Sequence, residues 1–188
     1  MVAVSGDATL ELMTGSGQQE FEVDERNLSI DGASHFAKAA FSVEVAGPVL
    51  DEYLDAELAR LGLSPDRLAL VGFSQGTMMS LHVGLRRTVK PAAIVGFSGL
   101  LAGAPPDAGF PPILLTHGDS DTVIPPQAMF LAAGQLGLAG AAVQWHLARG
   151  MGHGIDPEGL LMAGKFLALA FDGRLKSDGE VCSVYKPS

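Results

Sequence analysis

Cysteine is nearly absent from this chain, which has a single one, Cys182, among 188 residues. A lone cysteine cannot form an internal disulfide or a multi-cysteine metal site, so the sequence favours a reducing compartment. Basic side chains are also scarce, since 12 lysines and arginines stand against 21 acidic residues and the formal charge is −9. No basic cluster is longer than Arg86-Arg87. Such a chain repels phosphate backbones, so nucleic acid is not an expected partner.

Long apolar runs are missing as well. None approaches 18 residues, the length from which a membrane-spanning helix is considered. The start has no basic region of the kind found in secretory signals, because the first cation is Arg26. We therefore expect a cytoplasmic protein without a membrane span.

Short unbroken apolar runs after residue 62 predict an α/β fold. Runs without alternation indicate strands covered on both faces, as in a parallel sheet, and here they alternate with stretches of helical spacing. The predicted strands are Leu68 to Val71, Ala92 to Phe97, Ile113 to Thr116 and Ala141 to Leu147, and the predicted helices are Gln75 to Arg87, Pro126 to Leu138 and Pro157 to Phe171. We expect a wound, mostly parallel sheet flanked by helices.

The acidic first quarter of the chain has a different pattern. Thr9 to Met13 and Glu20 to Asp24 alternate apolar and polar residues around a turn-rich segment, which suggests an antiparallel hairpin. Apolar residues take up helical spacing from Ser34, a candidate N-cap, and continue it after Gly47-Pro48. The segment 49–62 is therefore expected to be an amphipathic helix.

The sharpest local motif is Gly72-Phe73-Ser74-Gln75-Gly76, where a predicted strand ends and a predicted helix begins. A serine at the apex of so sharp a turn needs neighbours with almost no side chain two residues away, and both glycines meet that need. The helix that starts at Gln75 directs its free N–H groups toward the serine, and the Gln75 N–H would be an oxyanion donor. Since the pattern arises by chance roughly 0.2 times at this composition, its context carries the prediction. The alternative is an ordinary glycine-flanked turn.

Two later loops supply the base and the orienting carboxylate that a weak serine nucleophile needs. Asp121 follows the strand Ile113 to Thr116, and His153 follows the strand Ala141 to Leu147. The order serine, acid, histidine is that of α/β-hydrolases. Because the carboxyl ends of parallel strands lie at one edge of the sheet, the three side chains are predicted to meet there. Asp119 is the alternative acid, and either aspartate could instead be a turn former.

Most other candidate residues are expected to be structural. They are His82, His117 and His146, whereas Ser98 is expected to be a pocket-floor or turn residue. Met78, Met79 and Met151 could line an acyl pocket or fill the core. No set of His, Cys and Glu has metal-ligand spacing, and no glycine-rich loop resembles a phosphate cradle. Neither a metal nor a cofactor is implied.

These motifs resemble the carboxylesterase/phospholipase family of small α/β-hydrolases, a group that includes bacterial carboxylesterases and acyl-protein thioesterases. The resemblance extends over about two-thirds of the chain. We therefore expect one hydrolase domain, 1–188. It would consist of an atypical acidic segment 1–45, a hydrolase core 46–171 and a loose tail 172–188. The resemblance is carried by the serine motif with the strand before it, by His117-Gly118-Asp119-Ser120-Asp121 with Val123 and Pro125, and by Gly152-His153-Gly154.

The resemblance implies a serine hydrolase that acts through an acyl-enzyme. Position by position, it implies Ser74 as the nucleophile, Asp121 as the orienting acid, His153 as general base and acid, and the Gln75 amide as an oxyanion donor. The implied substrates are small molecules, namely short- to medium-chain carboxylic esters or thioesters.

The first 45 residues depart from the family pattern. Members open with several strands and a His-Gly-rich loop whose backbone supplies a second oxyanion donor, and the sequence indicates neither. Losing such a donor typically costs on the order of 10²–10³ in kcat. The chain could therefore be a catalytically crippled, hydrolase-like module for binding or assembly. The edge of the strand Leu68 to Val71 would be bare unless the N-terminal segment, a partner chain or a swapped strand covers it, which allows a homodimer.

Overall fold

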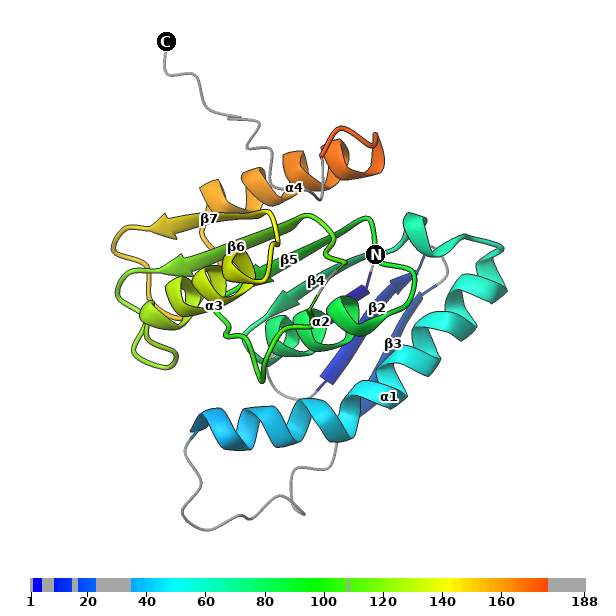
Figure 1. Cartoon of the computed structure of the whole chain (residues 1–188), viewed down its shortest axis with the longest axis horizontal. Coiled ribbons are helices and arrows are strands. Elements are labelled where there is room, and N and C mark those ends of the chain that lie inside the picture. Colours follow the sequence, from blue (N-terminus) through cyan, green and yellow to red (C-terminus); the bar gives the residue numbers. More distant parts are fainter. Residues whose placement is uncertain (1, 5–8, 15–16, 23–34, 108, 176–188) are drawn as a thin grey trace.

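The computed structural model describes residues 2–4, 9–14, 17–22, 35–107 and 109–175 (Figure 1). Within them runs a seven-stranded sheet in the order β3-β2-β1-β4-β5-β6-β7. The strands are β1 (Val2–Val4), β2 (Thr9–Thr14), β3 (Gly17–Glu22), β4 (Ala69–Phe73), β5 (Ala93–Phe97), β6 (Ile113–Gly118) and β7 (Val143–Ala148). Strand β1 and strands β4 to β7 form parallel pairs, as the apolar runs predicted for the strands after residue 62.

Four α-helices and one short 3-10 helix accompany these strands in the described part of the chain. They are α1 (His35–Leu61), η2 (Pro65–Arg67), α2 (Gln75–Arg86), α3 (Gln127–Leu138) and α4 (Pro157–Phe171). None of the described helices is both long enough and apolar enough to cross a bilayer. The predicted loose tail lies outside the described residues from 176 onward.

The central strands carry apolar side chains to both faces of the sheet. On one face Leu70, Ile94 and Leu115 join the core formed with α1, α2 and α3. On the other face Val95 and Leu114 pack with the buried residues of α4. Successive side chains of a strand point to opposite faces, so an unbroken apolar run contributes to both cores. Figure 1 shows α2 and α3 lying over one face of these strands.

Helix α1 is a single helix of 27 residues with Pro48 in its interior. An interior proline removes one backbone hydrogen bond and crowds the preceding turn. The helix continues because its buried face is the same on both sides of the proline: Val43 before it and Leu50 after it are each 2% exposed. Arg87, at the end of α2, also forms ion pairs with Asp51 and Asp55 of this helix. These contacts hold α1 against the helix that begins beside Ser74.

The N-terminal segment adds three strands beside β4. Strand β1 pairs in parallel with β4, with Val4 opposite Gly72, and β2 pairs antiparallel with both β1 and β3. The predicted hairpin is thus confirmed, although its second strand begins at Gly17 rather than Glu20. Of the three alternatives considered for the edge of β4, the structure shows the first, because the N-terminal segment itself covers that edge. Strand β1 has three residues, too few to show any periodicity in the sequence.

Candidate active site

Ser74 lies at the turn between β4 and α2 with φ 53° and ψ −115°. A positive φ is strained for a residue with a side chain, so the surrounding structure must impose it. The Ser74 N–H donates to the carbonyl of Phe97 at 2.8 Å. A Cβ on Gly72 would lie 2.2 Å from the carbonyl carbon of Gly76. The crossing backbone therefore requires glycine before the serine, which is what the motif predicted.

Thr77, in the first helical turn of α2, stabilises the backbone around Ser74 through its side chain. Its hydroxyl lies 2.9 Å from the carbonyl oxygen of Gly72 and 2.8 Å from that of Phe97. Its side chain also fills the space that a Cβ on Gly96 or Gly99 would need, since either Cβ would lie 2.4 Å from a Thr77 carbon. This support could not be predicted from the sequence, because the threonine and the two glycines meet only in the fold.

His153 lies between Ser74 and Asp121. Its Nε2 is 3.0 Å from Ser74 Oγ, and its Nδ1 is 2.7 Å from Asp121 Oδ2. The three residues come from the loops after β4, β6 and β7, so the parallel strands bring them to one edge of the sheet. Ser74 remains partly exposed. The structure thus brings together the three residues that the sequence named, within hydrogen-bond distance, with the nucleophile candidate Ser74 at the solvent-accessible end.

The carboxylate of Asp121 is buried and accepts several hydrogen bonds. Its Oδ1 accepts from the N–H groups of Val123 and Ile124 at 2.8 and 2.9 Å. Burial by itself raises the pKa of Asp121, but the hydrogen bonds from His153 and from these two N–H groups outweigh burial and lower the pKa below its ordinary value. The group beside the imidazole is therefore a fixed anion at neutral pH.

Two neighbours of Asp121 shape the loops around it. Asp119, the alternative acid, accepts a hydrogen bond through Oδ1 from the Gly150 N–H at 2.7 Å. It thereby holds the start of the histidine loop, residues 149–156 between β7 and α4. His117 Nε2 lies 2.8 Å from the carbonyl oxygen of Ile124 and donates to it, while it also lies 3.2 Å from Asp121 Oδ2. The expected structural role of His117 agrees with this contact.

The histidine loop is also held near its middle. Ser98, fully buried with φ 46°, donates its hydroxyl to the carbonyl of Gly154 at 2.9 Å. The ring of Phe73 lies 4.9 Å from the imidazole of His153, centroid to centroid. Met151 is partly exposed on this loop, whereas the other two methionines considered as pocket residues belong to the hydrophobic core. The position of His153 thus depends on contacts from the end of β4 and from the residue directly after β5.

Gln75 is the first residue of α2, and Ser74 is the N-cap without a side-chain capping hydrogen bond. The Thr77 N–H donates to the Ser74 carbonyl at 3.0 Å, so the groups that can face a charge beside Ser74 are the N–H groups of Gln75 and Gly76 at the very start of the helix. The predicted absence of a second donor loop concerns residues 1–45. Residues 5–8 and 23–34 of that segment lie outside the described residues, so this absence stays a prediction.

Gly118, at the end of β6, offers a test of how tightly the histidine loop is placed. A Cβ there would lie 2.2 Å from the carbonyl oxygen of Met151 and 2.4 Å from that of Gly152. Both are backbone atoms, so Gly118→Ala must displace the segment directly before His153. We expect kcat/KM for an activated ester to fall by at least about 10²-fold and the free energy of unfolding to fall by about 1–3 kcal/mol.

Gly134→Ala is the matched control for this substitution. Gly134 lies exposed in α3, and a Cβ there meets nothing within 4 Å, so the change should be neutral or stabilise the helix. Steady-state kinetics and urea titration of both variants measure the difference. Wild-type kinetics in Gly118→Ala would show that the loop relaxes without moving the imidazole.

Comparisons with known proteins point to one family. The sequence model of the family described as phospholipase/carboxylesterase matches residues 29–171. Acyl-protein thioesterase 1 of Gibberella zeae is 38% identical over 108 residues, which cover 53% of this chain and 46% of that protein. Acyl-protein thioesterase 1 of Schizosaccharomyces pombe is 43% identical over 86 residues, which cover 40% of this chain and 37% of that protein. This chain therefore spans less than half the length of either thioesterase.

A solved structure extends the similarity to the fold. The crystal structure of esterase PE8 matches with a TM-score of 0.68 and 37% identity, covering 74% of this chain and 66% of that chain.

Proposed function

The chain belongs to the phospholipase/carboxylesterase family of α/β-hydrolases, and from this premise we propose that it hydrolyses carboxylic esters or thioesters through an acyl-enzyme formed on Ser74. The observation that carries the proposal is the chain of two hydrogen-bond contacts, from Ser74 Oγ to His153 Nε2 and from His153 Nδ1 to Asp121 Oδ2. In this proposal Asp121 orients the imidazole and His153 is the general base and acid.

The geometry supports these roles through the tautomer that it selects. An ionised carboxylate only accepts hydrogen bonds, so Asp121 requires the imidazole proton on Nδ1. The lone pair of His153 Nε2 then faces the Ser74 hydroxyl at 3.0 Å. Ser74 Oγ attacks the carbonyl carbon while Nε2 takes its proton, and the imidazolium that forms is stabilised by the adjacent carboxylate.

The acyl-enzyme cycle uses the same groups twice. The negative oxygen of the tetrahedral intermediate lies at the start of α2, where the Gln75 N–H and the positive end of the helix dipole stabilise it. Its collapse expels the alcohol or thiol, which receives the proton from His153. A water molecule then gives a proton to His153 and attacks the acyl carbon. As this second intermediate collapses, the proton passes from His153 to Ser74 Oγ, which releases the carboxylic acid and restores the hydroxyl.

We propose that the substrates are esters or thioesters with short- to medium-chain acyl groups. Esters and thioesters undergo the same addition at the carbonyl carbon. An alcohol or a thiol is also a better leaving group than the amine of an amide, which depends more strongly on protonation before it can leave. The relatives that match are named as thioesterases and an esterase, which supports both substrate classes for a proposal on this chain.

A fluorophosphonate probe tests the proposed nucleophile directly. We expect the folded protein to be labelled at Ser74, as located by peptide mass spectrometry, and labelling to slow strongly in His153→Ala because the hydroxyl loses its base. Labelling at an equal rate in His153→Ala, or none in the folded wild type, would contradict the proposal. Absence of both labelling and ester turnover would favour the alternative of a hydrolase-like binding module.

A further inference from the structure

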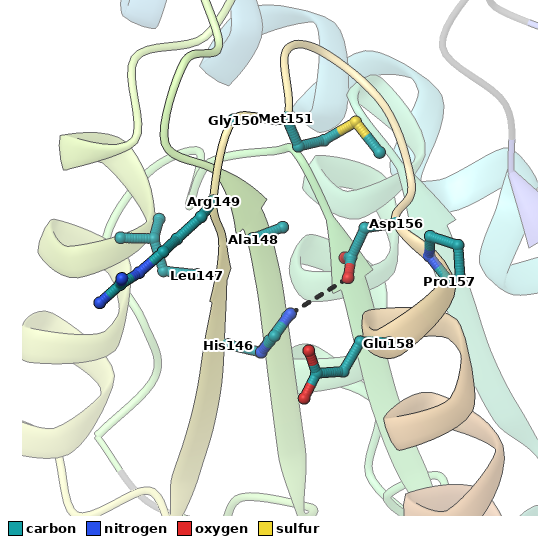
Figure 2. Close-up of a pocket in the computed structure, with 9 residues that line it drawn as sticks. All are labelled: His146, Leu147, Ala148, Arg149, Gly150, Met151, Asp156, Pro157 and Glu158. Atoms are coloured by element: carbon teal, nitrogen blue, oxygen red, sulfur yellow. Dashed lines mark hydrogen bonds and ion pairs between the residues drawn. The ribbon is translucent and has the colours of Figure 1, made fainter.

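A cavity of about 480 Å³ lies beside the histidine loop (Figure 2). It is lined by the last residues of β7, the start of the histidine loop and the first residues of α4. Ser74, Asp121 and His153 are not among its lining residues. The cavity is therefore separate from the candidate active site, although both adjoin the same loop.

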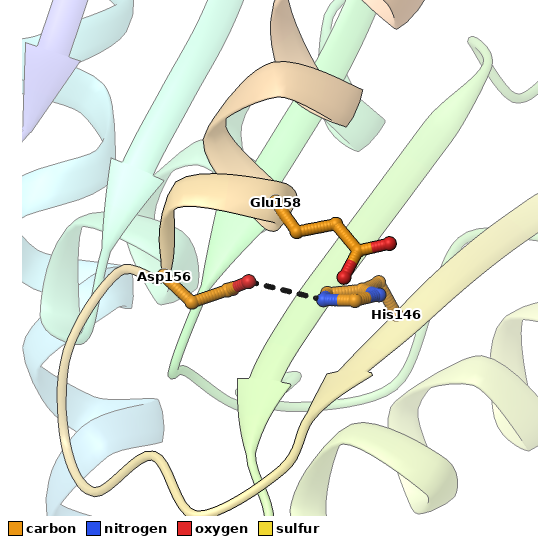
Figure 3. Close-up of side chains that lie close together, drawn as sticks. All are labelled: His146, Asp156 and Glu158. Atoms are coloured by element: carbon orange, nitrogen blue, oxygen red, sulfur yellow. Dashed lines mark hydrogen bonds and ion pairs between the residues drawn. The ribbon is translucent and has the colours of Figure 1, made fainter.

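Three side chains that can bind a metal line this cavity. His146 extends from β7, Asp156 is the N-cap of α4, and Glu158 lies in the first turn of that helix. One ligand atom of each lies within 4.8 Å of those of the other two. Figure 3 shows both carboxylates near the imidazole, with Asp156 directed at its nitrogen. No metal-ligand spacing is visible in the sequence here, because His146 belongs to β7 and the two acids lie at the start of α4.

The separation of the donors already suits coordination. His146 Nε2 lies 3.2 Å from Asp156 Oδ2, and two ligands of a tetrahedral zinc ion with bonds of 2.0–2.2 Å lie about 3.3 Å apart. Glu158 is exposed, so rotation of its side chain can bring a carboxylate oxygen to the same point. Asp156 accepts the Gly159 N–H as the cap of α4 at 2.9 Å, and its carboxylate retains further lone pairs for a cation.

The charges around the cluster are not balanced by nearby residues. Within the described residues, Glu158 has no hydrogen bond or ion pair. Arg149 also lines the cavity, but Figure 2 shows its side chain extended away from the three donors. In the part of the chain that the structure describes, two carboxylates therefore lie beside one imidazole, and no lysine or arginine forms an ion pair with either of them. The dipole of α4 disfavours a cation at this helix end, so binding requires both carboxylates.

We propose that His146, Asp156 and Glu158 bind a divalent cation of the zinc class, with the cavity providing room for a water molecule or an anion as a further ligand. One imidazole with two carboxylates suits Zn²⁺ and the chemically similar Co²⁺, whereas Ca²⁺ and Mg²⁺ prefer oxygen donors alone. The ion would join the end of β7 to the start of α4, and so connect the two ends of the histidine loop. The proposal is independent of the hydrolase activity.

Calorimetric titration of chelator-treated, tag-free protein with ZnCl₂ tests the proposal. We expect saturable binding of one equivalent and a higher melting temperature in the presence of the ion. His146→Gln and Glu158→Gln should each weaken binding at least about tenfold, and Glu158→Gln leaves the helix cap intact. Glu52→Gln is the matched control, since Glu52 is an exposed glutamate on α1, and it should bind zinc as the wild type does.

Two results would overturn the proposal. One is the absence of saturable zinc binding to the full chain. The other is binding of wild-type strength in both His146→Gln and Glu158→Gln, which would place the ion elsewhere. Unfolding monitored by circular dichroism shows whether each variant is folded, so that loss of binding is attributed to the donor and not to the fold. The appearance of tetrahedral Co²⁺ absorption bands in the wild type, and their loss in His146→Gln, would support the imidazole as a ligand.

Discussion

Ser74→Ala is expected to lower kcat for p-nitrophenyl acetate on the order of 10⁶-fold, the scale of loss when the nucleophile of a serine hydrolase is removed. The methyl group cannot attack the carbonyl carbon, and His153 Nε2 loses the hydroxyl that lies 3.0 Å away. The residual rate would come from the oxyanion donors and from binding alone. Initial rates at saturating substrate, compared with the buffer rate, measure the effect.

The fold of Ser74→Ala should remain intact, which makes the kinetic loss interpretable. The Ser74 N–H, and not its side chain, donates to the Phe97 carbonyl, so the turn keeps its hydrogen bond in the variant. Ser64→Ala is the matched control because Ser64 is an exposed N-cap with no side-chain capping hydrogen bond. Adding His153→Ala to Ser74→Ala should cause little further loss, since the residues act as a unit. A rate within tenfold of the wild type in Ser74→Ala would point to another nucleophile.

The strands and helices after residue 62 could be predicted because local patterns determine them. A buried parallel strand needs apolar side chains on both faces, and runs such as Ile113 to Thr116 contain them without interruption. The serine turn could be predicted for a similar reason, since the backbone crossing at Gly72 excludes a Cβ and leaves a glycine in the sequence. Parallel strand order then accounts for the meeting of Ser74, Asp121 and His153 at one edge.

The rest depends on contacts between residues that are distant in the sequence. Nothing near Gly118 indicates that its Cβ would strike the carbonyl oxygen of Met151, because the two loops meet only after β6 and β7 have paired. Strand β1 is similarly recognisable only through its pairing with β4. The choice between Asp119 and Asp121 also needed the fold, since both follow the same strand and only the geometry shows that Asp121 contacts the imidazole.

Asp121→Asn should lower kcat by about 10⁴-fold, the loss known when the acid of a serine protease triad becomes an amide. The backbone determines which way the amide faces. The N–H groups of Val123 and Ile124 both donate to Oδ1, so the oxygen of asparagine stays there and its NH₂ group faces His153 Nδ1. An NH₂ group donates, so the imidazole must accept at Nδ1 and carry its proton on Nε2. It then has no lone pair for the Ser74 proton. Steady-state kinetics at neutral pH measure the loss.

The dependence of the free energy of unfolding on pH separates the loss of kcat in Asp121→Asn from a general weakening of the fold. The lowered pKa of Asp121 means that folding favours its ionised form, so this contribution to stability is present well above the unfolded pKa of about 3.9 and is lost as the pH falls through the folded value. Asparagine does not titrate. The difference in free energy of unfolding between wild type and Asp121→Asn, measured by urea titration, should therefore stay constant near neutral pH and narrow below about pH 3.9. A difference that does not change with pH would show that the carboxylate charge contributes nothing to the stability of the folded state, and it would contradict a fixed anion beside His153 that selects the imidazole tautomer.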